Sequence, residues 1–138
     1  MNQTHNTNFY EMLSAACRKN GKGTAVFNDK EKTTYHALKQ EVDAVAAYLQ
    51  NIGVKFGDKV ALAVSNSPEF ISAYFAVSAI GAVAVPMNTF LKNNEYAYIL
   101  NDCKARFMFA SAGLQKELKG LKKQTRVEKI IWIGEAKA

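Results

Sequence analysis

Apolar residues along the chain follow two spacings, one typical of helices and one typical of buried strands. The clearest helical spacing follows Thr34, where apolar residues recur every three or four positions on one predicted face: Leu38, Val42, Val45, Leu49 and Ile52. Thr34 is a suitable N-cap, and Gly53 can adopt the left-handed conformation that ends many helices. An earlier helix is predicted between a cap at Asn8 and a stop at Gly21, with Glu11 completing a capping-box pattern.

A continuous apolar run, Val60–Val64, predicts a strand that is buried on both faces. Parallel sheets covered by helices contain such strands, whereas half-exposed strands alternate apolar and polar residues. The segment Asn66–Glu69 then starts a predicted helix, with proline in the first turn and an acid near the positive end of the helix dipole. Gly81 ends this helix, and Ala82–Val85 predicts a second strand. This order indicates a parallel βαβ unit.

The same alternation continues to the end of the chain. A helix capped by Asn93 or Asn94 precedes a predicted strand at Arg106–Ala110. A shorter helix, which contains Leu114, Leu118 and Leu121, then precedes a predicted strand. That last strand covers residues 129–133.

Two short strands near the N-terminus, Thr24–Phe27 and Lys32–Thr34, predict a β-hairpin with its turn at Asn28–Asp29. We therefore expect an α/β fold with a doubly wound, mainly parallel sheet, flanked by helices and preceded by a short hairpin. No linker or low-complexity segment interrupts the pattern, so residues 1–138 are expected to form a single unit. The polar residues 1–7 are expected to be disordered.

The composition is that of a globular protein. Of the 138 residues, 49% are hydrophobic and 22% are charged, which excludes a wholly disordered chain. No apolar run approaches the roughly 20 residues needed to span a bilayer, and the N-terminus lacks a secretory signal. These features predict a soluble, cytoplasmic protein with no integral membrane segment.

The net charge of +6 is concentrated toward the C-terminus, where six basic residues occur: Lys116, Lys119, Lys122, Lys123, Arg126 and Lys129. Such a stripe could bind phosphate groups, but a solvated face is the preferred interpretation. No aromatic platform or groove-reading motif accompanies it, so we predict no nucleic-acid partner.

Two segments have residue types found in phosphate-binding loops. Gly21–Thr24 follows a helix and precedes a strand, which is the reverse of the order in a P-loop and favours a plain connecting loop. Ser65–Ser67 lies where a parallel strand ends and a helix begins, which is where such folds bind anions. Simple helix capping explains the same serine and asparagine residues, so both interpretations stay open.

The chain lacks the residue sets of a metal centre or a nucleophilic triad. His5 and His36 are the only histidines, and Cys17 and Cys103 lie far apart in the sequence, so no zinc site or disulfide framework is predicted. The cysteines are expected to be small buried side chains, and His36 to lie on the surface in the first turn of a helix. Four aromatic residues could form a ligand cage, although core packing is the commoner role at helical spacing: Tyr74, Phe75, Tyr96 and Tyr98.

Five segments occur in a characteristic order between about Phe9 and Gly134. They are Thr34-Tyr35 with Leu38, Gly53-Val54 with Gly57–Ala61, Asn66–Phe70, Gly81–Asn88 and Glu95–Ala105. In residue type and spacing they resemble the motifs of the adenylate-forming enzymes, a family that includes acyl-CoA synthetases, luciferases and peptide-synthetase adenylation domains. Ala37 stands where that family usually has an acid, a difference that affects a local cap or surface contact. The sequence motifs are most similar to those of fatty-acid-type acyl-CoA ligases.

The resemblance implies a reaction in two steps. In that family, a carboxylate attacks the α-phosphate of ATP to give an acyl-adenylate, and the thiol of coenzyme A then takes the acyl group, while Mg²⁺ neutralises the phosphates. The family's phosphate loop, nucleotide contacts and catalytic lysine come later than any residue of this chain. We therefore assign no catalytic, cofactor-binding or metal-binding residue, and we expect an inactive N-terminal fragment.

The resemblance also implies partners: the remainder of the ligase and a carboxylic-acid substrate. Helical surfaces such as Phe70–Ile80 would then lack some cover, so we expect self-association into a homo-oligomer. The alternative hypothesis is a standalone α/β module that binds a small anion or another protein at the Asn66 helix start. A Ser/Thr/Gly-rich loop with a lysine, encoded after Ala138, would support the ligase, and a stop codon would support the module.

Overall fold

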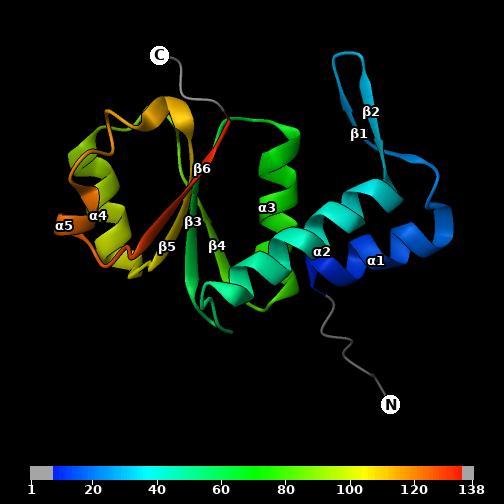
Figure 1. The fold of residues 1–138 in the computed structure, drawn as a ribbon, viewed down its shortest axis with the longest axis horizontal. Coiled ribbons are helices and arrows are strands. Elements are labelled where there is room, and N and C mark those ends of the chain that lie inside the picture. Colours follow the sequence, from blue (N-terminus) through cyan, green and yellow to red (C-terminus); the bar gives the residue numbers. More distant parts are fainter. Residues whose placement is uncertain (1–7, 135–138) are drawn as a thin grey trace.

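The computed structural model describes residues 8–134 (Figure 1). Its helices are α1 (Phe9–Asn20), α2 (Tyr35–Asn51), α3 (Pro68–Ala79), α4 (Asn93–Cys103), the 3₁₀ turn η1 (Ala112–Leu114) and α5 (Leu121–Gln124). Its strands are β1 (Thr24–Asn28), β2 (Glu31–Thr34), β3 (Lys59–Ala63), β4 (Val83–Pro86), β5 (Phe107–Ser111) and β6 (Lys129–Ile133). The expected α/β fold is confirmed, whereas residues 1–7, with their expected disorder, lie outside the described residues.

The strands form two separate sheets. β1 and β2 pair as an antiparallel hairpin, and the other four strands form a parallel sheet in the order β4-β3-β5-β6. This sheet lies between two layers of helices, with α1, α2 and α3 on one face and α4 and α5 on the other (Figure 1). The hairpin projects away from the sheet beside α2 (Figure 1).

The central strand β3 serves both layers at once. Val60 and Leu62 pack with the helices α1–α3, whereas Ala61 and Ala63 pack with α4. All four side chains are 0% exposed. The continuous apolar run of the sequence therefore reflects two cores that share one strand, with the larger residues facing the thicker helical layer.

The order of the strands reverses at β3. Helix α3 connects β3 to its neighbour β4, and α4 then carries the chain across to β5 on the other side of β3. Because α3, which follows β3, and α5, which follows β5, belong to opposite layers, the loops that follow β3 and β5 leave the sheet on opposite faces. This doubly wound arrangement is the predicted one, and such folds bind ligands at the carboxyl ends of the two strands beside the reversal.

Three predicted helix starts are confirmed by side-chain caps. Asn8, Thr34 and Ser67 each accept a hydrogen bond from the backbone N–H three residues later, at 2.9, 3.1 and 3.2 Å. These bonds satisfy N–H groups that have no partner within the helix. Gly53 and Gly81, the predicted ends of α2 and α3, have φ values of 98° and 72°, which favour glycine.

The start of α4 differs from the prediction. Lys92 is the N-cap residue, rather than Asn93 or Asn94, and its N–H donates to Glu95 Oε2 at 2.7 Å. The Asn93 side chain instead donates to the carbonyl oxygen of Glu117 at 2.7 Å. The Asn93 side chain, which the sequence predicted to cap α4, thus bonds to a segment that is distant in the chain.

The predicted helix around Leu114–Leu121 is wrong. The 3₁₀ turn ends at Leu114, and α5 begins only at Leu121, after Gly120 with φ 77°. Leu118 and Leu121 are nevertheless buried. The leucine spacing therefore indicates which side chains of an irregular segment are buried in the core. The left-handed conformation of Gly120 prevents one continuous helix.

The hairpin turn lies one residue later than predicted. β1 extends to Asn28, and the two turn residues are Asp29 and Lys30. Asp29 has φ 51°, a conformation that aspartate adopts more readily than most residues do.

Charged side chains join the amino ends of β3, β5 and β6. Arg106 Nη1 lies 3.3 Å from Asp58 Oδ2, and its Nε lies 2.8 Å from Glu128 Oε1. Asp58 Oδ2 also accepts from Lys55 N at 2.8 Å, so the same carboxylate shapes the turn before β3. Hydrogen bonding to the Arg106 guanidinium lowers the pKa of Glu128. The Gly57–Asp58 pair of the resemblance therefore has a structural role.

Replacing Leu49 with aspartate tests the buried face of α2. Leu49 is 0% exposed, so Leu49→Asp should lose roughly 1.5–3 kcal/mol of burial and also bury an unpaired charge. Against a total stability of about 5–15 kcal/mol, we expect a chain that is unfolded or nearly so in thermal melts. The control is Gln40→Asp at an exposed position of the same helix, and equal melting temperatures for both variants would contradict the assignment.

Candidate functional site

The loop after β3, residues 65–67, lies at the carboxyl end of the sheet beside the reversal in strand order. We call it the Asn66 loop. Ser65 N donates to Ser111 Oγ at 3.0 Å, and the two serine Oγ atoms are 3.5 Å apart. Ser111 is the last residue of β5, so these contacts join the ends of the two strands that flank the reversal. The loop is therefore anchored where doubly wound folds bind ligands.

Within this loop, Ser67 is used for capping. Its Oγ accepts from Phe70 N, and Pro68, at the start of α3, has no N–H to offer a ligand. Ser65 and Asn66 are exposed. The capping interpretation thus accounts for Ser67, while Ser65 and Asn66 are the polar side chains that reach the surface.

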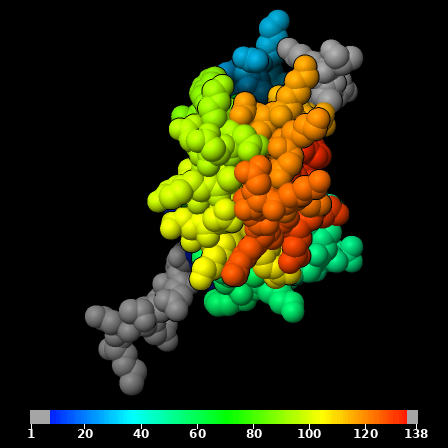
Figure 2. Space-filling model, turned by 90° about the vertical axis from the view of Figure 1, so that its left-hand side faces the viewer, coloured from blue at the N-terminus to red at the C-terminus, as the bar shows by residue number. Residues whose placement is uncertain are grey.

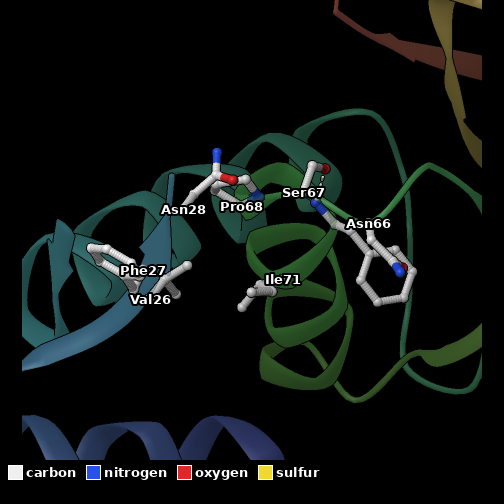
Figure 3. Close-up of a pocket in the computed structure, with 8 residues that line it drawn as sticks. Val26, Phe27, Asn28, Asn66, Ser67, Pro68 and Ile71 are labelled. Atoms are coloured by element: carbon white, nitrogen blue, oxygen red, sulfur yellow. Dashed lines mark hydrogen bonds between the residues drawn. The ribbon is translucent and has the colours of Figure 1, made fainter. Parts of the chain in front are cut away.

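Two cavities flank the Asn66 loop. The first, of about 320 Å³, lies between the hairpin and the first turn of α3, with Val26 and Phe27 on one side and Pro68 and Ile71 on the other (Figure 3). The second, of about 370 Å³, lies between the Asn66 loop and the loop that follows β4. Asn66 lines both cavities. Its amide is the polar group that they share.

The loop after β4 is anchored by a hydrogen bond from a buried tyrosine of α4. Tyr96 is 0% exposed, and its hydroxyl donates to the backbone oxygen of Asn88 at 2.8 Å. Asn88 Oδ1 in turn accepts from Phe90 N at 2.9 Å, and the Phe90 ring is 88% exposed. Burial, followed by the nearby carboxylates of Glu117 and Glu95, raises the pKa of Tyr96. The hydroxyl thus stays protonated and fixes this wall of the second cavity.

The walls of both cavities consist of apolar residues and neutral polar groups, without a charged side chain. Among residues 8–134, no group of three His, Cys, Asp or Glu side chains is placed to hold a metal ion. A nucleotide triphosphate with Mg²⁺ needs cationic groups near its phosphates and carboxylates near its metal. The residues present do not fit that group. They offer neutral hydrogen-bonding atoms and apolar surface.

The other phosphate-loop candidate, Gly21–Thr24, connects α1 to β1. The carbonyl oxygens of Gly21 and Gly23 accept from His36 N and Tyr35 N at 2.9 and 3.0 Å. The segment thus turns carbonyl groups, rather than N–H groups, toward the start of α2, as expected of a plain connecting loop. His36 is exposed in the first turn of α2, as predicted.

Both cysteines differ from the prediction that they would be buried. Cys17 and Cys103 are free and only partly buried. Each lies in the last turn of a helix, near the surface of the molecule.

The four aromatic candidates do not form a cage. Tyr74 and Phe75 pack against Phe9, with ring centroids 5.5 and 6.4 Å apart, between α1 and α3. Tyr96 and Tyr98 belong to α4 in the opposite layer, where Tyr96 is buried and Tyr98 is 74% exposed. The packing interpretation is therefore the correct one for three of the four residues.

The basic residues of the C-terminal stripe are all exposed. They belong to a segment, coloured orange to red in Figure 2, that runs along the α4–α5 face of the molecule. In the part of the chain that the structure describes, no helix is long and apolar enough to cross a membrane.

Comparison with known proteins decides the family. The AMP-binding enzyme family matches residues 13–138. The chain belongs to this family. Curated relatives include crotonobetaine/carnitine–CoA ligase of Escherichia coli O139:H28, which is 40% identical over 79 residues. That match covers 57% of this chain and 15% of the relative, so the chain spans only a small part of the relative's length.

Solved structures of ligases share the fold. An anthranilate CoA ligase, AuaEII, superimposes with a TM-score of 0.87 at 30% identity, covering 93% of this chain and 25% of that one. The N-terminal domain of FACL13 from Mycobacterium tuberculosis gives a TM-score of 0.85 at 26% identity, covering 91% of this chain and 33% of that one. The chain thus has the fold found in the N-terminal part of acyl-CoA ligases.

Sequence reasoning did not predict the role of three residues that build this edge of the sheet: Asn88, Tyr96 and Ser111. For Ser111 a signal existed, because a serine directly follows the strand, as Ser65 follows the preceding apolar run. The bond from Tyr96 to Asn88 had no such signal, because it requires α4 to lie beneath the loop.

Replacing Tyr96 with phenylalanine tests how the second cavity is held. Tyr96→Phe removes the donor to Asn88 O and should lower the free energy of unfolding by about 0.5–1.5 kcal/mol. Denaturant titration measures this loss. Tyr98→Phe, at a 74% exposed position of the same helix, is the control and should change stability little. Equal losses in the two variants would show that the hydroxyl of Tyr96 has no special role.

Proposed function

We propose that this chain is part of the large N-terminal domain of an acyl-CoA ligase. The complete enzyme would form an acyl-adenylate from ATP and a carboxylic acid, and then transfer the acyl group to coenzyme A. The observation that carries the proposal is the match of the AMP-binding enzyme family across residues 13–138. The ligase names of the relatives and of the solved structures support it. We also propose that residues 1–138 belong to a single unit of that domain.

In this proposal the chain supplies scaffold and one neutral wall of the site. The Asn66 loop and the loop after β4 offer amide, hydroxyl and apolar groups, without a cation for phosphate or a carboxylate for Mg²⁺. Phosphoryl and adenylyl transfer depend on such charged groups to stabilise the transition state. The residues that bind ATP, Mg²⁺ and coenzyme A would therefore belong to the rest of the enzyme.

The class of substrate follows from what the relatives have in common. Their names include crotonobetaine or carnitine, anthranilate, benzoate and fatty acids, which share a carboxylate and differ in the attached group. A carboxylic acid is thus the proposed substrate. The more specific prediction of a fatty acid rests on the similarity of the sequence motifs to those of fatty-acid-type ligases. The cytoplasmic location and the lack of a nucleic-acid partner also stay predictions.

An apolar groove supports a partner region in the complete enzyme. It has a volume of about 340 Å³ and lies between α2, α3 and the outer strand β6. Val45, Tyr48, Ile131 and Ile133 line it, and each is only partly covered. Strand β6 also has no neighbour on its outer side within residues 8–134. Such surfaces are usually covered by further elements of the same domain.

An assay of the isolated chain tests the proposed division of roles. We expect no carboxylate-dependent exchange of pyrophosphate into ATP and no acyl-CoA, because the two cavities beside the Asn66 loop, within residues 8–134, have no charged side chain for that chemistry. The crotonobetaine/carnitine–CoA ligase of Escherichia coli serves as the positive control. Exchange above background that disappears in the Leu49→Asp variant would show that this chain is itself a complete catalyst.

The oligomeric state of the isolated chain tests whether its apolar surfaces require cover. We expect self-association at micromolar concentration, because the groove and the open strand edges would pair with a second copy. Sedimentation velocity measures the association, and a hydrophobic dye reports exposed apolar surface. A monomer that binds no dye would remove the argument for a missing partner region.

A further inference from the structure

Cys17 and His36 form a close pair far from the Asn66 loop. Cys17 lies in the last turn of α1 and His36 in the first turn of α2, and the distance from Sγ to Nδ1 is 3.5 Å. His36 is exposed and Cys17 is partly exposed, so solvent reaches the pair. Neither residue lines the cavities beside the Asn66 loop. The proposed ligase function makes no use of them.

The fold fixes this pair where the end of α1 meets the start of α2. His36 N donates to Gly21 O at 2.9 Å, which holds the start of α2 against the loop after α1. Gly21 lies against both side chains, because a Cβ at this position would be 2.9 Å from Cys17 O, 3.5 Å from His36 Nδ1 and 3.8 Å from Cys17 Sγ. A larger residue at position 21 would therefore collide with the end of α1. The glycine thus lets the end of α1 approach the start of α2 closely, which brings the sulfur and the imidazole together.

Three basic residues, Arg18, Lys19 and Lys22, lie within five positions of Cys17 along the chain. Acidic residues lie somewhat farther away: Glu11 is six positions from Cys17, and Glu31 and Glu41 are each five positions from His36. His36 also lies near the positive end of the α2 dipole. Basic side chains close to a thiol attract anionic reagents.

The second cysteine provides an internal comparison. Cys103 Sγ donates to Leu100 O at 3.7 Å at the end of α4, so a carbonyl group faces its thiol instead of a base. Both cysteines are partly buried, and each lies at the end of a helix. The imidazole beside Cys17 is the main difference between them.

We propose that Cys17 is a thiol–disulfide exchange site in which His36 acts as the base, with a small anionic disulfide as its substrate. His36 Nδ1 takes the thiol proton, and Sγ attacks one sulfur of the disulfide. A bond from Sγ to that sulfur forms as the original S–S bond breaks. The second sulfur leaves as a thiolate and takes up a proton. Cys17 is thereby oxidised to a mixed disulfide, and half of the reagent is reduced to a thiol.

Two single-cysteine variants test which thiol reacts. Cys103→Ser retains Cys17, Cys17→Ser retains Cys103, and each is treated with oxidised glutathione at neutral pH while intact mass is followed. We expect the Cys103→Ser protein to react about tenfold faster or more, because only Cys17 has an adjacent base. Equal rates, or a faster Cys17→Ser protein, would overturn the proposal.

His36→Gln in the Cys103→Ser background tests the base. Because His36 is exposed, this variant should keep the melting temperature of its parent. We expect exchange to slow about tenfold at neutral pH. The two rates should converge near pH ~10, where thiols ionise without a base. A folded His36→Gln protein that reacts as fast as its parent at neutral pH would overturn the role of His36.

Discussion

The full burial of β3 between two helical layers is the constraint on which the rest of the structure depends. A strand with no exposed face must place one set of side chains in each core, which here are Val60 and Leu62 on one side and Ala61 and Ala63 on the other. Its parallel neighbours can be reached only through crossovers, and these place α3 and α4 on opposite faces. That arrangement brings Ser65 to Ser111 at the carboxyl edge of the sheet.

Charge and candidate site lie at opposite ends of the same strands. The bonds among Asp58, Arg106 and Glu128 join the amino ends and stabilise the turn before β3. The carboxyl ends carry neutral groups, which are anchored by Tyr96 below one loop and by Ser67 at the start of α3. The charges of this chain near the sheet therefore support its fold, while the carboxyl edge offers shape and neutral hydrogen bonds to a ligand.

The segments that resemble the ligase family are explained here by their structural roles. Asp58 shapes a turn, Ser67 caps a helix, and Gly81 adopts φ 72° where a Cβ would collide with the Phe56 ring. Such positions restrict the residue type because of backbone conformation and close packing. This explains how residues with structural roles can carry a specific family pattern.

The sequence by itself determined the type and order of most elements. Caps at Asn8, Thr34 and Ser67, stops at Gly53 and Gly81, and the apolar run of β3 act over a few residues, so local physics decides them. The family resemblance likewise needed only the order of short segments.

Only the tertiary structure decided contacts between segments that are distant in the chain. The Asn93 side chain, expected to cap α4, donates to Glu117 O instead. Leu118 is buried although no continuous helix contains it. The bond from Ser65 to Ser111 and the approach of Cys17 to His36 join residues 46 and 19 positions apart. No local spacing encodes such contacts, because they exist only once two cores have packed on one buried strand.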